Sequence, residues 1–315
     1  MNENELVARV RQLFSQRIGD DAAVVDNLVI TTDMLIEDID FTRAIPLPFI
    51  ARKSLAVNLS DIAAMGATPS YAVVALGLPD WARENIDTFL LALRDGSARW
   101  QTEIVGGDFS RSEKLVISIA AVGRITTRPL LRSGAKTGDR IYISRPVGGS
   151  AAGLFLLQNG WNVDAADSRA SYVQREFARS AISRHIDPEP EIGLGIDLAH
   201  IDEVTACIDI SDGLSTDLHH LCEASQCGAE IERQRIPIFP DLLDSGMSLG
   251  IQVQDAVLHG GEEYALLFTS SLRESELSSR VRRPVYAIGK ITTGRDVLLN
   301  GTPLEARGWD HFRPS

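Results

Sequence analysis

Residues 49–65 read Phe-Ile-Ala-Arg-Lys-Ser-Leu-Ala-Val-Asn-Leu-Ser-Asp-Ile-Ala-Ala-Met, which predicts one mainly apolar helix. Gly66 follows this run as a C′ glycine, the residue that most often ends a helix. Asp61 stands within the apolar run, and Asn58 lies three residues before it, so the two share one side of the helix. If it is buried, such a carboxylate must be paired or bound to a metal. The alternative is that Ser60 and Asp61 begin a new helix.

Working outward from this helix, five short motifs place an aspartate beside Gly, Ser or Thr. They are Gly19-Asp20-Asp21-Ala22, Thr31-Thr32-Asp33, Asn58-Leu59-Ser60-Asp61, Gly106-Gly107-Asp108 and Asp209-Ile210-Ser211-Asp212-Gly213. A sixth motif, Gly260-Gly261-Glu262-Glu263-Tyr264, is acidic in the same way. Mg²⁺ takes oxygen ligands and bridges to substrate phosphates, which suits carboxylates on glycine-rich turns. We therefore predict a site with several metal ions that handles nucleotide phosphates.

Each motif also has a plainer explanation. Gly107-Asp108 follows a short strand expected at 103–105, and can be a turn with a capping aspartate. In the motif 209–213, alternation directs Asp209 and Ser211 to one side of a strand. Asp212 or Ser211 can cap the helix that follows, but capping explains one residue of this motif and not all three.

The composition indicates a globular protein and excludes several function classes. The 315 residues, 44% of them hydrophobic, suffice for a buried core and suggest two domains. The three cysteines form neither a disulfide framework nor a zinc site, so we expect a reduced, cytoplasmic protein. We expect no signal peptide at the acidic start and no membrane span. A net charge of −12 argues against nucleic-acid and membrane partners. Because like charges repel, an acidic pocket holds a triphosphate only with cations between them.

Strand-like and helix-like runs alternate along both halves of the chain, which predicts an α+β fold built of two α/β-type domains. A polar connector with Pro129, Gly134 and Gly138 places the boundary near residue 137. The predicted domains are 1–137 and 138–315. Helices are expected at 5–14, 49–65, 81–100, 151–158, 168–183 and 213–226. Strands are expected at 22–25, 28–32, 71–78, 103–105, 115–122, 140–144, 204–210, 263–269 and 285–289.

Other well-known motifs are absent or incomplete. Gly134-Ala135-Lys136-Thr137 lacks the glycine that precedes the lysine of a phosphate-binding loop. Gly193-Leu194-Gly195 lacks the third glycine of a dinucleotide fingerprint and is better explained by helix packing. His219 and His220 are adjacent and point apart on a helix, so we do not expect them to be ligands.

Taken in order, the motifs resemble the thiamine-monophosphate kinase family, which belongs to the superfamily of aminoimidazole ribonucleotide synthetase. The resemblance extends over nearly the whole chain. It rests on residues 19–23, 32–37, 53–67, 106–108, 132–139, 209–214 and 260–264. It implies the architecture of that superfamily, with an N-terminal mixed sheet that dimerises and a C-terminal α+β domain that completes the nucleotide and substrate site. It also implies transfer of phosphate from ATP to thiamine monophosphate, giving thiamine diphosphate.

The resemblance assigns roles to particular residues. The metal and phosphate site would comprise Asp20 or Asp21, Thr32, Asp33, Asp61, Asp108, Asp209 and Asp212. Of these, Asp61, Asp108, Asp209 and Asp212 would be catalytic. ATP would contact Thr32, Gly107, Asp108, Arg132 and Ser211. The acceptor would contact Asp40, Glu262 and Trp309. The implied co-substrate is ATP, and the implied cofactor is Mg²⁺ in several copies.

The chain departs from the family pattern at a few positions. Asp40 stands where the family usually has histidine, and Gly149 stands where it commonly has aspartate. Phe109 and Ser110 follow Gly-Gly-Asp in place of small hydroxyl residues. Two alternatives therefore remain: a related ATP-dependent enzyme with another phosphorylated acceptor, or an inactive nucleotide-binding relative. Selenophosphate synthetase and the hydrogenase-maturation carbamoyl dehydratase are disfavoured, because their characteristic cysteines are missing.

Overall fold

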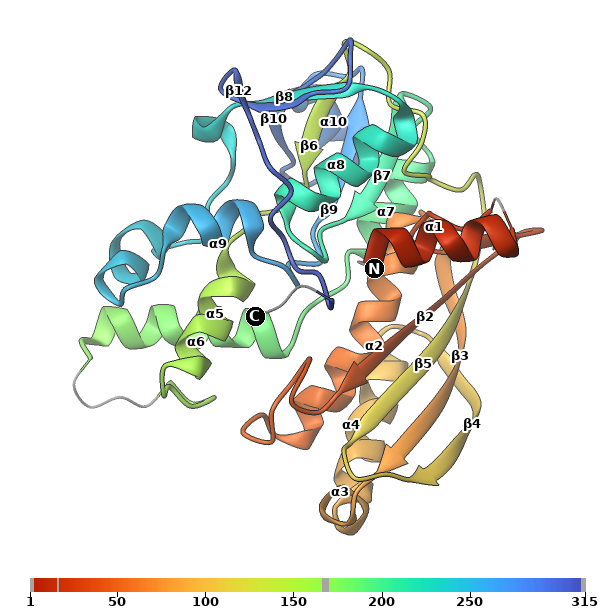
Figure 1. The fold of residues 1–315 in the computed structure, drawn as a ribbon, viewed down its shortest axis with the longest axis vertical. Helices are drawn as coiled ribbons and strands as arrows, with labels where there is room; N and C mark the ends of the chain where they lie inside the picture. Colours follow the sequence, from red (N-terminus) through yellow and green to blue (C-terminus); the bar gives the residue numbers. More distant parts are fainter. Residues whose placement is uncertain (1–2, 16, 166–169, 313–315) are drawn as a thin grey trace.

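The computed structural model describes residues 3–15, 17–165 and 170–312, which form two mixed β-sheets with helices packed on them (Figure 1). Strands and helices occur in both halves, so the predicted α+β class is confirmed. Among the described residues, no helix is long and apolar enough to cross a membrane.

The N-terminal half builds a five-stranded sheet of order β1-β2-β5-β3-β4. Neighbouring strands are antiparallel except β3 and β4, which are parallel. Its elements are α1 (Glu3–Leu13), β1 (Ala23–Val25), β2 (Leu28–Ile36), α2 (Leu47–Ala64), β3 (Thr68–Leu78), α3 (Asp80–Glu84), α4 (Ile86–Arg99), β4 (Glu103–Arg111) and β5 (Val116–Arg124).

The two faces of this sheet have different surroundings. Helices α2 and α4 lie against one face, here called the inner face (Figure 1). Ile117, Ile119 and Val74 point into the core on that side. The residues between them point the opposite way, because side chains alternate along a strand. On this outer face, large apolar side chains remain exposed: Val25, Ile30, Met34, Tyr71 and Val73.

The C-terminal half builds a seven-stranded sheet of order β12-β11-β8-β10-β6-β9-β7. Only β8 and β11 run parallel; the other neighbours are antiparallel. Its strands are β6 (Arg140–Ile143), β7 (Val204–Asp209), β8 (Gly228–Ile231), β9 (Leu266–Ser270), β10 (Tyr286–Thr292), β11 (Val297–Leu299) and β12 (Thr302–Pro303). Its helices are α5 (Gly149–Gln158), α6 (Tyr172–Ile186), α7 (Ile192–Ala199), α8 (Leu214–Ser225), α9 (Val253–His259) and α10 (Glu274–Val281), with short turns at Arg233–Arg235 and Leu242–Gly246.

Helix α2 is the element that joins the two halves. It packs on β2 and β5 on one side and on α7 and β7 on the other. The approach to α7 is close, because a Cβ at Gly195 would lie 2.0 Å from the Ala63 carbonyl oxygen. Gly195 is therefore a packing glycine, as predicted. Polar residues on α2 consequently face the boundary between the halves.

Several element boundaries differ from those expected. The helix predicted over 81–100 is two helices, α3 and α4, separated at Asn85. Gly106-Gly107-Asp108 lies inside β4 and does not follow it as a turn. Part of the helix predicted at 168–183 lies outside the described residues, and α6 begins at Tyr172. The short elements α7, α9, α10, β8, β11 and β12 were not predicted, because brief elements carry little periodicity.

Candidate active site

Three carboxylates from distant parts of the chain meet at the boundary between the two halves. Asp21 precedes β1, Asp61 lies on α2, and Asp209 ends β7. One carboxylate oxygen from each residue lies within 4.8 Å of the other two. Asp21 and Asp209 are buried, and Asp61 is partly buried. We call these three residues the aspartate cluster.

Hydroxyl groups fix the orientation of two of these carboxylates. Thr31 Oγ1 donates a hydrogen bond to Asp61 Oδ2 at 2.5 Å. Ser60 Oγ donates one to Asp209 Oδ2 at 2.5 Å and so links α2 to β7. Ser60 and Asp61 both lie well inside α2, so the alternative that they begin a new helix is wrong.

The aspartate cluster has the features of a cation site. Asp21 Oδ2 and Asp209 Oδ1 are buried and make no hydrogen bond among the described residues. Burial, followed by the charges of neighbouring carboxylates, raises the pKa of Asp61 and of Asp209 well above the ordinary value. Buried charges of one sign are costly unless an opposite charge compensates them. A hard divalent cation such as Mg²⁺ fits this set of oxygen donors.

Asp33 extends the cluster along β2. Burial, followed by the charges of Asp40 and Asp21, raises the pKa of Asp33 to about 6. The Asp33 backbone N–H donates to Asn58 Oδ1 at 3.0 Å, and Asn58 Nδ2 donates to the Ser54 carbonyl at 3.0 Å. Asn58 therefore ties β2 to α2 and holds Asp33 beside the aspartate cluster.

Arg132 closes the other side of the cluster. Its Nη2 donates to Asp21 Oδ1 at 2.8 Å, and its backbone N–H donates to Asp20 Oδ1 at 2.7 Å. Ser225 Oγ donates to the Arg132 carbonyl at 2.9 Å and fixes the backbone from α8. Of the two adjacent aspartates, Asp21 joins the cluster, whereas Asp20 holds the backbone of Arg132.

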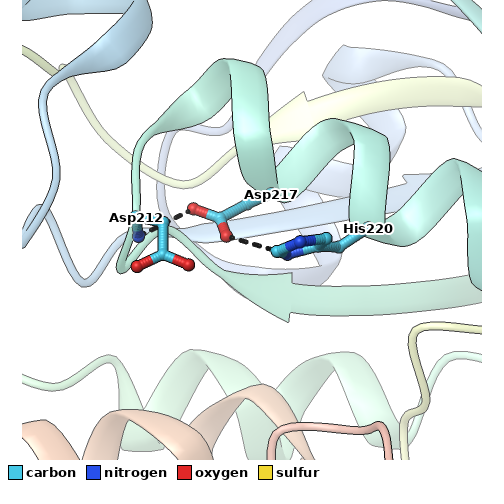
Figure 2. Close-up of side chains that lie close together, drawn as sticks. All are labelled: Asp212, Asp217 and His220. Carbon is cyan, nitrogen blue, oxygen red and sulfur yellow. Dashed lines mark hydrogen bonds and ion pairs between the residues drawn. The ribbon is translucent and has the colours of Figure 1, made fainter. Parts of the chain in front are cut away.

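A side chain of the following helix, α8, fixes the turn after β7. Asp217 Oδ2 accepts the backbone N–H group of Asp212 at 3.2 Å (Figure 2). It also accepts the backbone N–H group of Gly213 at 3.0 Å. Asp217 Oδ1 lies 3.7 Å from His220 Nδ1. Burial opposes the charge of His220, but Asp217 outweighs it and raises the pKa of the imidazole. The expectation that Ser211 or Asp212 caps this helix is wrong, because Gly213 is the N-cap residue and no side chain caps the helix there. Asp217 instead fixes the turn that precedes the helix.

With this geometry in view, similarity to known proteins becomes informative. The model of the AIR synthase related protein, N-terminal domain, matches residues 19–125. The model of the AIR synthase related protein, C-terminal domain, matches residues 136–299. Thiamine-monophosphate kinase of Escherichia coli K12 is 38% identical to this chain and covers 94% of it, with 91% of the relative covered. The enzyme of that name from Haemophilus influenzae is 36% identical and covers 95% of this chain, with 92% of the relative covered.

The chain belongs to the thiamine-monophosphate kinase family. It is therefore an enzyme, a phosphotransferase, and the resemblance read from its motifs is confirmed. The solved structure of AaThiL complexed with AMPPCP and TMP is 31% identical, has a TM-score of 0.88, and is matched over 99% of this chain and 97% of that one. This kinase family fold thus extends over essentially the whole chain.

A second polar group lies at the other end of α2. Glu262 Oε1 lies 2.6 Å from Lys53 Nζ, and Glu262 Oε2 lies 3.2 Å from His185 Nδ1. Burial opposes the charge of Glu262, but the charge of Lys53 outweighs the effect of burial and lowers the pKa of this carboxyl. Asp40 is close enough to Glu262 and Lys53 for their charges to act on it. We call the region around these residues the acceptor end of the site.

Trp309 is attached through its backbone to the turn that carries Asp212. Its N–H donates to the Asp212 carbonyl at 3.0 Å, while its ring is 54% exposed. The preceding residue must be small, because a Cβ at Gly308 would lie 2.2 Å from the same carbonyl oxygen. The final described segment therefore lies over the turn that carries Asp212.

The structure places three further predicted site residues, Thr32, Asp108 and Gly107, away from the aspartate cluster of the same chain. Thr32 points to the outer face of β2, and Thr31 occupies the position beside Asp61. Asp108 pairs in register with Ala75, on the outer face and three strands from β2. A Cβ at Gly107 would lie 1.9 Å from the Val74 carbonyl oxygen, so close strand packing explains this glycine.

Gly149 leaves no room for the aspartate that the family commonly has. A Cβ at this position would lie 2.4 Å from the Phe239 ring. Glu263 serves the start of α5 in its place, because its Oε1 accepts the N–H groups of Gly148 and Ser150 at 2.8 and 2.9 Å. Glu263 and Thr31 both belong to acidic motifs found in the sequence, but neither was assigned a role there.

Proposed function

We propose that this enzyme transfers the terminal phosphate of ATP to thiamine monophosphate, giving thiamine diphosphate and ADP, with the help of several Mg²⁺ ions. The observation that carries the proposal is the aspartate cluster with its two unpartnered buried oxygens. The family membership and the ligands named for AaThiL support the choice of co-substrates.

Asp21, Asp33, Asp61, Asp209 and Asp212 would hold the metal. Bound Mg²⁺ would neutralise phosphate charge and align the donor and acceptor for in-line transfer. Because the attacking phosphate oxygen of thiamine monophosphate is already ionised, the enzyme needs no strong general base. The main role of these residues is therefore to position the metal ions and to balance the charge of the phosphates.

Other residues would bind the two substrates. Arg132, fixed by Asp21, presents a guanidinium group that suits phosphate. Ser211 lies on the turn beside Asp212. Trp309 offers an exposed ring for stacking on a cationic or aromatic heterocycle. Glu262 and Asp40 would contact the acceptor.

The reaction is tested directly by incubating the purified protein with Mg-ATP and thiamine monophosphate. We expect thiamine diphosphate and ADP in equal amounts by chromatography, and loss of both products in EDTA. ATP binding without either product would reject the proposed reaction. Asp40 favours one second candidate in that case, a kinase for another phosphorylated acceptor, because a carboxylate near the acceptor phosphate repels it.

We further propose a homodimer formed through the outer face of the N-terminal sheet. The exposed apolar side chains of that face form a surface that monomers rarely leave uncovered. Thr32 and Asp108 share this face, so a partner subunit could receive them. In light scattering, Val73→Lys should convert the dimer to a monomer. Val116→Lys, at the end of a strand, is the control and should have a weaker effect on the dimer.

Two further assignments are proposals of the same kind. We propose residues 1–137 as the metal-, ATP- and dimer-forming domain and 138–315 as the domain that completes the site. The proposed boundary falls in the connector between β5 and β6. We also propose a cytoplasmic location, in keeping with the three free cysteines.

A further inference from the structure

Lys53 is a buried cation with one partner. Its side chain is 2% exposed, and among the described residues Glu262 is the only carboxylate with which it forms an ion pair, at 2.6 Å. Burying an ammonium group is costly unless a charge of opposite sign compensates it. The pair therefore constrains both residues, and it joins α2 of the N-terminal half to the turn before β9.

Contacts with buried residues hold Glu262 in place, while its side chain remains partly exposed. Its backbone adopts φ +59°, a left-handed conformation that is rare for residues other than glycine. The Glu262 N–H donates to the Ser211 carbonyl at 2.7 Å, which fixes this strained turn to the turn that carries Asp212. Its side chain is 29% exposed, whereas the Lys53 and His185 side chains behind it are almost fully buried.

His185 does not replace Lys53 as the cation. Burial, followed by the charge of Lys53, lowers the pKa of His185 to about 4, so the ring is neutral near neutral pH. The Ser150 hydroxyl also lies 3.1 Å from His185 Nδ1. The lysine is thus the charged member of this group, and the histidine is a neutral hydrogen-bonding partner.

We propose that Lys53 is a positioning residue for acceptor recognition: it holds the Glu262 carboxylate charged and directed outward, ready to accept a hydrogen bond from a cationic or amine-bearing heterocycle. This inference rests on the proposed function. It predicts that Lys53 acts on acceptor binding through Glu262 and leaves the nucleotide and metal end unchanged.

The test compares steady-state kinetics of the full-length protein with Mg-ATP and thiamine monophosphate. Lys53→Met should raise KM for thiamine monophosphate about tenfold, which corresponds to the loss of one hydrogen bond to a charged group. KM for ATP should change less than about twofold. Arg52→Met is the matched control. Arg52, the neighbour on α2, also pairs across the two halves, with Asp187 at 2.8 Å, but away from Glu262. It should leave both KM values unchanged.

A double variant separates positioning from general support of the fold. If Lys53 acts through Glu262, then Lys53→Met/Glu262→Gln should have the KM of Glu262→Gln alone. The double variant leaves no unpaired buried charge, so it serves even where Lys53→Met does not fold. A further rise in KM in the double variant, or an equal rise in both KM values, overturns the inference.

The wild-type protein distinguishes failure of the inference from failure of the proposed function. If wild type forms no thiamine diphosphate, the proposed function fails and the inference fails with it. If wild type is active and Lys53→Met keeps its KM for thiamine monophosphate, only the inference about Lys53 is overturned.

Discussion

Two carboxylates at different positions along helix α2, Asp61 on the helix and Glu262 beside Lys53, are in opposite electrostatic situations. Asp61 and Lys53 are eight residues apart, or about 12 Å along the helix axis. At the metal end, burial and neighbouring aspartates raise the pKa of Asp61 well above its usual value. At the acceptor end, Lys53 lowers the pKa of Glu262 despite burial. Burial acts in the same way on both carboxyl groups, so the charge of the nearest neighbour decides whether the pKa rises or falls.

This difference separates what each end requires. In the aspartate cluster, Arg132 forms an ion pair with Asp21, but two buried oxygens of the cluster have no hydrogen-bond partner among the described residues. The carboxylate of the acceptor end already has its cation within the protein. One helix thus supports a carboxylate cluster that we propose to bind metal and an ion pair that is formed within the protein itself.

Removing one carboxylate at each end gives the largest contrast. Asp61→Asn should lower kcat about 100- to 1000-fold, because charge stabilisation at the moving phosphate is lost. Glu262→Gln should act mainly on KM for the acceptor. Steady-state kinetics of both variants measure this split. Ser54→Ala, another polar change on α2 but away from the cluster, is the control, and full activity of Asp61→Asn would sink the metal-site assignment.

The pH dependence of stability without metal tests the electrostatics. Asp33 has its pKa raised from 3.8 to about 6, so the folded state binds this proton more tightly than the unfolded chain. Stability in EDTA should therefore fall as pH rises from about 4 through about 6, and further as Asp61 and Asp209 ionise. Mg²⁺ at about 100 times its Kd should add roughly 2.7 kcal/mol, and more at neutral than at acid pH. Thermal unfolding at several pH values measures both effects. An equal Mg²⁺ effect at every pH contradicts the prediction.

The segment that carries Trp309 connects the two ends and can be displaced selectively. In Gly308→Ala, the new Cβ would lie 2.2 Å from the Asp212 carbonyl oxygen, so the segment must move. We expect KM for the acceptor to rise about fivefold, or about 1 kcal/mol, with a small change in melting temperature. Gly193→Ala is the control, because the nearest neighbour of a Cβ at Gly193 would be the Arg283 guanidinium, 3.8 Å away. Unchanged kinetics in Gly308→Ala would separate Trp309 from the site.

The smallest expected effect concerns His220 behind the metal end. Asp217 raises the pKa of His220 above the ordinary value of 6.5 for histidine, so the pair stabilises the fold fully below pH 6.5. The contribution is lost as pH rises through the folded-state value. His220→Gln should therefore lower stability by about 0.5–1 kcal/mol at acid pH and by less at alkaline pH. Chemical denaturation at two pH values checks this, and the opposite trend would show that the pair is not charged.

Part of the site was predictable because it follows from local chemistry. A carboxylate in an apolar helix, as at Asp61, and three polar residues after a strand, as at 209–212, are unusual enough to indicate function. The acidic motifs and their order were also sufficient to identify the family. The division of 81–100 at Asn85 was not predictable, since the apolar pattern continues across it.

Other residues were missed because their roles depend on distant partners. Thr31 and Thr32 are equivalent in the sequence, and only the pairing of β2 with β5 decides which one faces Asp61. Asp217 reads as an ordinary helix residue until the turn before α8 folds back onto it. Lys53 reads as a solvated lysine, and its partner is more than two hundred residues away.

The sequence by itself determined the α+β class, the family and the acidic residues of the candidate site, because composition, strand alternation and motif order are local properties of a chain. Only the tertiary structure decided which of these residues meet. Asp21, Asp61 and Asp209 come together because α2 packs between the two sheets, whereas Asp108 points away on the outer face. The tertiary structure also decided the direction of each pKa shift, because a group is buried and placed beside a particular charge only once distant segments pack together.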